Sequence, residues 1–570
     1  MYSRIFLFIL TLFFLACNSA PPPVLADLIL VNGQIATVDE QEPQVEAIAI
    51  QKGKILATGT NDDINKLVGE NTQVIDLEGN FAMPGFIEGH GHFSSIGNTL
   101  QNLNFIKSKS WNEIVAMVAE KAKMAKPGEW IIGRGWHQEK WEGTLDKQVL
   151  GYPYHDKLSE ISPDNPVLLR HASGHGLLAN QKAMQIAGVS KETPNPTGGE
   201  IVRDSRGEAI GMFEETAMDL IDAAYQEYLT TLSEEDKARI WFEGIELAEA
   251  ECIKKGITSF QDAGSSFVEI ERYKQLAEKG ELDLRLWVMI GSREENLSEN
   301  LKNFPILNAG NQFFTCRAIK GYLDGALGSF GAWLLAPYDD KPNFYGQNVT
   351  PIEEIETIAK LAAQHGLQYC VHAIGDRGNR EMLDLYEQIF QTMPDKTDFR
   401  WRIEHAQHID PVDIPRFGQL GVIAAMQAIH CTSDAPFVIK RLGEKRAREG
   451  AYPWRSLLDS GAIVTNGTDA PVEDVDPIES YYASVTRKRS DSGMAFFPAQ
   501  SLNRTEALKA YTLSNAYAAF EENEKGSLTV GKLADVTVLS KNLLTCTDDE
   551  ILEAEVLYTI IGGKVKYNKG

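Results

Sequence analysis

The sequence predicts an α/β protein: a (β/α)8 TIM barrel, a small β-sandwich domain formed from both chain ends, and a large insertion after the first barrel strand. Two observations lead to this prediction. Eight short apolar runs alternate with helical stretches in the middle of the chain, and both ends hold short β-rich runs broken by turn residues. Continuous apolar strands that alternate with helices are typical of a parallel sheet covered on both faces.

The barrel is expected over residues 81–514. Its predicted strands are Phe81–Glu88, Gly256–Gln261, Leu284–Ile290, Cys316–Leu323, Leu367–Ala373, Phe399–Glu404, Gly421–Gln427 and Ala462–Asn466. The first two strands are too far apart in the sequence for a single crossover. Residues from about 97 to 237 are therefore expected to form the insertion.

The composite β domain is expected to combine residues 26–80 with residues 515–570. Asn32-Gly33 near the start and Gly562-Gly563 near the end are turn signals between β-rich runs. Because the two ends share this texture, we expect them to build one domain.

Residues 1–16 have the features of a secretory signal peptide. Arg4 supplies a positive charge, and Ile5–Leu15 is a short apolar run. Phe14-Leu15-Ala16-Cys17 resembles a bacterial lipobox, after which residues 17–25 form a linker. This pattern predicts export and a lipid anchor at Cys17 on a bacterial membrane, facing the periplasm or the exterior. The alternative is an ordinary cleaved signal with an incidental cysteine.

The charge balance limits the partners. The 570 residues carry 55 Lys and Arg against 80 Asp and Glu, a formal charge of −25. This excess argues against nucleic acid, and we expect a small-molecule substrate. No apolar run after the first twenty residues is long enough to cross a bilayer, so membrane contact is expected only through Cys17. The sequence leaves open whether the chain forms a homo-oligomer. The five other cysteines are far apart and predict no disulfide framework.

Residues that bind metals stand at the ends of several predicted strands. His90-Gly91-His92 follows the first strand, and residues i and i+2 of an extended chain project to the same side. His372 lies at the end of the fifth predicted strand, and His405 and Asp469 follow later strands. Each alone has an ordinary structural explanation, such as a hydrogen-bonded core histidine or a turn aspartate.

Together these residues indicate a metal site. Active sites of such barrels lie at the C-terminal ends of the strands, so all these ends face one cavity. Lys320 lies inside the apolar fourth strand, where an unpaired lysine is unusual. Imidazole and carboxylate ligands favour zinc or a neighbouring divalent ion.

The motifs resemble those of the amidohydrolase superfamily, and within it the YtcJ-like metal-dependent hydrolases, a group that includes N-substituted formamide deformylase. The resemblance covers nearly the whole chain after the signal segment. It is carried by Ala26–Gly33, Met83–His92, Ile319–Ser329, Val371–Asp376 and Gly526–Asp535.

The resemblance implies a role for each residue of the predicted site. His90 and His92 match ligands of a more buried ion, and His372 and His405 match ligands of a second ion. Lys320 matches a lysine that is often carboxylated to bridge two ions. Two ions are thus expected if Lys320 is carboxylated, and one if it is not. Asp469 matches an aspartate that binds metal and shuttles the proton.

The implied activity is hydrolysis of a non-peptide C–N bond, of the amide or formamide type, by attack of a metal-bound hydroxide. Hydrolysis of an ester or another C–O bond on the same site, and a non-catalytic ligand-binding lipoprotein, are the alternatives. Trp136, His175, Asp324 and His430 are candidates for substrate contact, and a structural role is equally open for each.

Overall fold

Eight parallel strands form a nearly closed barrel in the computed structural model, which describes residues 24–570 except 106–107, 139–140, 143–144, 172–175, 198, 294 and 329. Around the barrel they are β8 (Phe86–Gly91), β17 (Ile257–Ser265), β18 (Arg285–Gly291), β20 (Phe314–Tyr322), β21 (Gln368–Ala373), β22 (Arg402–His405), β23 (Ile423–Met426) and β24 (Val464–Asn466). Each pairs in parallel with the next, and β24 lies against β8. The predicted (β/α)8 fold is confirmed.

Helices cover the outside of the barrel. They include α8 (Phe267–Lys279), α11 (Ile352–Gln364), α12 (Asp376–Gln391), α14 (Ala428–Leu442) and α17 (Pro477–Thr486). On α12, Met382, Tyr386 and Ile389 recur at helical spacing and are buried, so one apolar stripe packs on the sheet. Near-continuous apolar strands and amphipathic helices thus produce the two layers that the sequence predicts.

The predicted first strand, Phe81–Glu88, is divided into two strands that belong to different sheets. β7 (Phe81–Pro84) pairs with β2 and β25 of the β domain, whereas β8 pairs with β17 of the barrel. Gly85 separates them, and a Cβ there would lie 2.1 Å from the Thr258 side chain. The run is apolar on both sides of Gly85, so its composition does not reveal the change of sheet.

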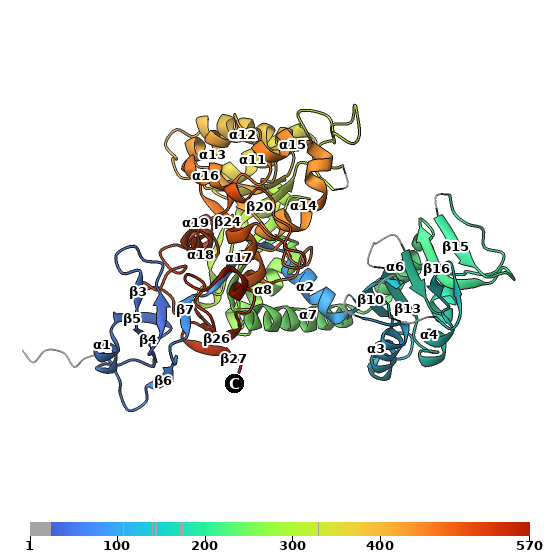
Figure 1. Ribbon diagram of the computed structural model, residues 1–570, viewed down its shortest axis with the longest axis horizontal. Helices are drawn as coiled ribbons and strands as arrows, with labels where there is room; N and C mark the ends of the chain where they lie inside the picture. Colours follow the sequence, from blue (N-terminus) through green and yellow to red (C-terminus); the bar gives the residue numbers. More distant parts are fainter. Residues whose placement is uncertain are drawn as a thin grey trace, which may run out of the picture.

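Both chain ends contribute to the β domain, as predicted. One sheet has the order β27-β26-β25-β7-β2-β3 and the other β5-β4-β1-β6. Its strands are β1 (Leu28–Val31), β2 (Gln34–Ala36), β3 (Gln44–Val45), β4 (Ala47–Gln51), β5 (Lys54–Gly59), β6 (Gln73–Asp76), β7, β25 (Val536–Leu539), β26 (Val556–Ile561) and β27 (Lys564–Asn568). Figure 1 shows the N-terminal and C-terminal strands side by side.

The predicted domain boundary at residue 515 falls within α19 (Leu513–Ala518), which packs against the barrel instead. Asn515 Nδ2 donates to the carbonyl oxygens of Ile87, at 2.7 Å, and Asn466, at 2.8 Å. These carbonyls belong to β8 and β24, so Asn515 bridges the first and last strands where the barrel closes.

The insertion folds around its own sheet, with strand order β15-β16-β14-β13-β10-β9. These strands are β9 (Leu103–Asn104), β10 (Ile131–Trp136), β13 (Val167–His171), β14 (Gly176–Ala179), β15 (Gly199–Arg203) and β16 (Ala209–Glu215). It is joined to the barrel through α2 (Phe93–Gln101) and the long helix α7 (Glu234–Lys254). Figure 1 shows most of it beyond the far end of α7. At its near edge, Asn104 and Arg134 line a cavity together with Ala470 and Pro471, which directly follow Asp469.

Some predictions fall outside the described residues. The signal segment at residues 1–16, Cys17 and His175 are among them. In the described part of the chain, no helix is both long enough and apolar enough to cross a membrane. The five described cysteines are free.

Candidate metal centre

The predicted ligand residues meet at the C-terminal ends of the barrel strands. His90 lies in β8, Lys320 in β20, His372 in β21 and His405 at the end of β22. Two more follow directly: His92 is the N-cap of α2, and Asp469 lies in the loop after β24. The fold therefore places six residues from distant parts of the sequence at one face of the barrel.

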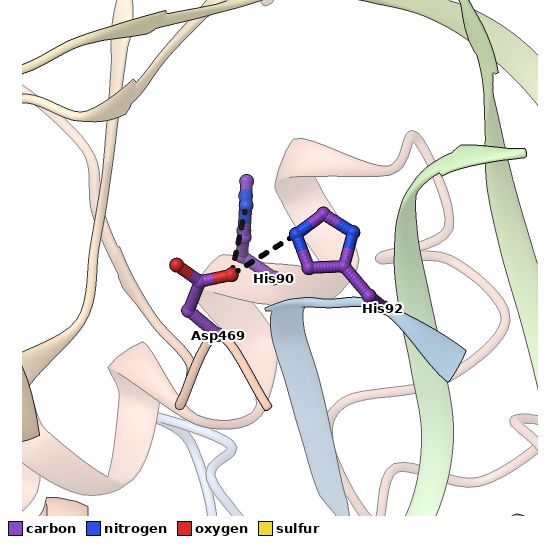
Figure 2. A group of neighbouring side chains, drawn as sticks. All are labelled: His90, His92 and Asp469. Carbon is purple, nitrogen blue, oxygen red and sulfur yellow. Dashed lines mark ion pairs between the residues drawn. The ribbon is translucent and has the colours of Figure 1, made fainter. Parts of the chain in front are cut away.

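Asp469 lies between the two histidines of the first strand. Its Oδ1 is 3.6 Å from His90 Nε2 and 3.2 Å from His92 Nε2. Figure 2 shows both rings directed at this oxygen. His90 is 1% exposed and His92 29%, so the second histidine faces the open side of the site. These three atoms are close enough to share one cation.

The orientation of His90 is fixed from behind by a carboxylate. His90 Nδ1 hydrogen-bonds to Glu404 Oε2, and Glu404 forms a buried ion pair with Arg402, whose Nε is 2.7 Å from Oε1. Arg402 also donates to the Gly89 carbonyl at 2.8 Å. A carboxylate partner holds the proton on Nδ1 and leaves the Nε2 lone pair directed into the site.

His405 is held in the same way from the other side. Its Nδ1 lies 2.6 Å from Gln427 Oε1, an acceptor, so Nδ1 carries the proton and Nε2 is left free. With His430 and Asp469 it forms a second group of atoms close enough to share a cation. Asp469 is common to both groups.

His372 and Lys320 complete the set. The His372 ring lies 4.5 Å from that of His405. The Lys320 side chain is 1% exposed, and its Nζ is 3.3 Å from His90 Nε2. The structure thus brings all six predicted ligand residues together.

Burial keeps the imidazoles neutral. It lowers the pKa of His90 to about 4, with a further contribution from the Lys320 charge, and the pKa of His372 to about 3. Burial, with the facing His372, also holds the pKa of His405 well below its usual value. A neutral imidazole is the form that binds a metal, because its lone pair is free.

Asp469 is an ionised carboxylate. Burial would raise its pKa, but the neighbouring His92 and the facing His90 hold that pKa well below the usual value. The Asp469 backbone has a φ of 58°, a conformation uncommon outside glycine. Glu88 Oε1 accepts a hydrogen bond from the Thr468 N–H and so ties this loop to the first strand.

The donor set fits a divalent ion. Within the described residues, His372 Nε2, His430 Nε2 and Asp469 Oδ1 are buried without any hydrogen-bond partner. Such unpartnered groups are costly in an interior unless something binds them. Neutral imidazoles beside one carboxylate are the ligands of zinc and related ions.

The four predicted substrate contacts lie in different surroundings. The Asp324 carboxylate accepts backbone N–H bonds from Trp333, Ile374 and Gly375, each at 2.8 Å, and its Oδ1 lies 3.6 Å from His372 Nε2, so it holds loops together beside a predicted ligand. Trp136 is fully buried in the insertion, and its indole donates to the Leu169 carbonyl at 2.8 Å.

The remaining two candidates, His175 and His430, differ in whether the structure describes them. His175 falls outside the described residues. His430 points into the site, with Nε2 3.9 Å from Asp469 Oδ2. Among the described candidates, Asp324 lies beside the predicted ligand His372, and His430 is the one that faces Asp469.

Sequence reasoning missed the residues that hold the ligands. Arg402 and Glu404 alternate in β22 and are fully buried, which is the same signal that singled out Lys320 in β20. Gln427 and Gln407 carry no such signal, because an isolated glutamine after a strand is common at any barrel rim.

Comparison with known proteins agrees with this geometry. The amidohydrolase family model matches residues 73–567. The chain belongs to the amidohydrolase family. It is 34% identical to Protein LONG AFTER FAR-RED 3 of Arabidopsis thaliana, covering 98% of this chain and 94% of that protein. It is 30% identical to YtcJ of Bacillus subtilis, covering 94% of this chain and 99% of YtcJ.

The chain is also similar to a further curated enzyme and to a solved structure. N-substituted formamide deformylase of Arthrobacter pascens is 26% identical, with 95% of this chain and 98% of that enzyme covered. The crystal structure of an uncharacterized metal-dependent hydrolase from Pyrococcus furiosus superposes with a TM-score of 0.72 at 25% identity, covering 91% of this chain and all of that one. The chain is thus a metal-dependent hydrolase of the amidohydrolase family, as the sequence motifs indicated.

Proposed function

We propose that this hydrolase cleaves a non-peptide C–N bond, of the amide or formamide type, in a small molecule. The observation that carries the proposal is the convergence of neutral imidazoles and the ionised Asp469 at the barrel mouth, with buried atoms left unpartnered. Its likeness to N-substituted formamide deformylase supports the choice of bond.

His90, His92 and Asp469 would hold a divalent ion, and the neighbouring His372 and His405 would contribute further ligands at this centre. Such an ion, when bound, lowers the pKa of a water molecule to about 7 and polarises a carbonyl oxygen. The donor set favours zinc.

Asp469 would move the proton. Its carboxylate is ionised, so it can take a proton from the attacking water as the new C–O bond forms. It would then deliver this proton to the nitrogen as the C–N bond breaks, so that a neutral amine leaves. The 29% exposed His92 marks the side from which substrate reaches Asp469.

Lys320 would decide the number of ions. Carboxylation of its amine makes an anion that can lie between two cations, whereas an unmodified lysine beside His90 leaves one. We expect two ions per chain with carboxylated Lys320 and one without. Mass analysis of the intact protein, together with its metal content, distinguishes the two.

The test of the proposed reaction is a panel of N-formyl and N-acyl amines, each with its matched ester. Turnover of the amides should disappear on chelation and return when zinc is added. Higher kcat/KM on esters would favour C–O cleavage instead. Ligand binding without turnover of either series would support the non-catalytic alternative, and turnover by the metal-free protein would overturn the proposal.

We further propose that the chain is exported and anchored through a lipid on Cys17. The Cys17→Ser variant should then be found outside the membrane fraction, whereas the wild type is found within it. Equal release of both proteins would contradict the anchor.

A further inference from the structure

His430 is the polar side chain of the site whose role the proposed reaction leaves open. It lies in the first turn of α14, directly above β23, and its side chain is 9% exposed. Its ring lies nearly parallel to that of His405, with centroids 6.0 Å apart. Nε2 is 3.9 Å from Asp469 Oδ2 and has no hydrogen-bond partner among the described residues.

Two roles fit this position. If Nε2 carries a lone pair, His430 is a third ligand beside His405 and Asp469, because the ligand atoms of these three residues lie within 4.8 Å of one another. If Nε2 carries the proton, it cannot bind a cation, and it presents an N–H to whatever lies next to Asp469. The other ring nitrogen decides between them, since a neutral imidazole carries one proton.

That other nitrogen faces Gln407. The Gln407 Nε2 amide group donates to His430 Nδ1 at 3.2 Å. An Nδ1 that accepts a hydrogen bond has no proton, so the proton is on Nε2. His90 and His405 show the opposite arrangement, because their Nδ1 atoms face the acceptor oxygens of Glu404 and Gln427.

Gln407 is held in place on both sides. The backbone carbonyl oxygen of Gln407 accepts a hydrogen bond from the Tyr452 N–H at 2.6 Å. The backbone N–H of the next residue, His408, donates to the Ile374 carbonyl at 3.0 Å. Gln407 is 4% exposed. The backbone that carries this amide is therefore fixed at the rim of the barrel, and the residue is buried there.

We infer that His430 is a catalytic hydrogen-bond donor and not a metal ligand: its Nε2–H points beside Asp469, where it would bind the carbonyl oxygen of the substrate and the negative charge that develops there. Gln407 is the positioning residue that keeps the proton on Nε2. The identity of the substrate group that His430 would bind rests on the proposed function. The assignment of the tautomer does not rest on it.

The first experiment measures metal content and kinetics of His430→Phe and His430→Gln, with His365→Gln at the C-terminal end of α11 as the control. We expect all variants to keep the wild-type zinc content. His430→Phe should lose about 10²–10³-fold in kcat, the usual effect of removing one such donor. His430→Gln should recover at least about tenfold of this loss, because its amide can donate from a similar position. Loss of zinc from His430→Phe would overturn the inference, since it would make His430 a ligand. A kcat within threefold of wild type would also overturn it.

The second experiment needs no substrate. Zinc-loaded protein with ¹⁵N-labelled histidine is compared with its His430→Gln variant, so that the difference spectrum reports His430 among the 11 histidines. We expect the Nε2–H tautomer in the wild type. In Gln407→Glu the new carboxylate should draw the proton to Nδ1 and lower kcat about as much as His430→Phe. An Nδ1–H tautomer in the wild type would overturn the inference. If the wild type hydrolyses no amide or ester, the proposed function fails, and the spectrum and zinc content still decide the role of His430.

Discussion

Two clusters of buried charge lie in different parts of the barrel, and their hydrogen bonding differs sharply. Where the barrel meets the β domain, Arg285 at the start of β18 forms an ion pair with Asp535, with contacts of 2.8 and 3.1 Å. Asp535 also accepts from the Gly562 N–H, and Arg285 donates to the Gln312 carbonyl. At the C-terminal ends of the strands, His372, His430 and Asp469 each leave a buried atom without a partner in the described chain.

The difference separates stability from function. Each unmade hydrogen bond in an interior costs about 1–3 kcal/mol. The three unpartnered atoms at the barrel mouth belong to histidine and aspartate residues, which are metal-ligand types, so an ion bound there would satisfy them. In TIM barrels the C-terminal face carries the chemistry and the opposite face carries stability, and the two clusters follow this rule.

The largest effect is expected for Asp469→Asn. An amide cannot accept the proton from the attacking water, so kcat/KM should fall by about 10⁴-fold. The free energy of unfolding of the metal-free protein should fall as well, because the low pKa of Asp469 means that the folded state stabilises its charged form. Steady-state hydrolysis by zinc-loaded protein and denaturant unfolding measure the two quantities. Activity within tenfold of wild type would show that another group moves the proton.

A loss of stability without a loss of activity is expected for Asp535→Asn. Breaking one side of the buried pair leaves the Arg285 charge uncompensated and should reduce the free energy of unfolding by about 3–5 kcal/mol. The zinc content and kcat of the folded variant should stay within threefold of wild type. A loss of zinc with no loss of stability would abolish the distinction between the two clusters.

The fold and the ligand set were accessible from the sequence because both depend on local patterns. Apolar runs between helices predicted the barrel, and His90, His92, His372, His405 and Asp469 each follow such a run directly. Position along a strand then fixes which face of the barrel a side chain reaches, whatever the distance in sequence.

Contacts between distant segments were not accessible. Asp324 follows a strand as Asp469 does, but its three backbone partners come from loops whose path the sequence does not show. For Trp136 a structural role was equally open, and its contact with the Leu169 carbonyl depends on how the insertion packs. Gln407 and Gln427 act through the ring nitrogen that each one faces, which only coordinates reveal.

A third buried acidic group tests how burial alone affects stability. Glu249 of α7 accepts from the Asp283 and Leu284 N–H groups, and burial raises its pKa to about 7. Between pH 4.5 and 7 the folded state thus binds more protons than the unfolded state, so its contribution to stability falls as pH rises. The free energy of unfolding of Glu249→Gln, relative to that of the wild type, should therefore increase by up to about 3 kcal/mol between pH 4 and pH 8. Urea unfolding at several pH values measures this, with the exposed Glu246→Gln as control. A difference that does not change with pH would contradict the raised pKa.

The smallest effect sharpens the comparison most, because Glu404 belongs to both kinds of cluster. It is paired with Arg402, as Asp535 is with Arg285, yet its other contact is His90 Nδ1. The carboxylate charge of Glu404 orients the His90 ring and increases the basicity of that ring. Glu404→Gln keeps the shape of the side chain but removes this charge. Zinc affinity should therefore fall by about 10–100-fold, the usual effect of losing such a partner. Competition with a zinc-binding dye measures it, and Asp535→Asn, which also alters a buried ion pair, is the matched control. If both variants lowered zinc affinity equally, the effect would come from general destabilisation, and the division between a structural and a functional cluster would fail at the residue where the two meet.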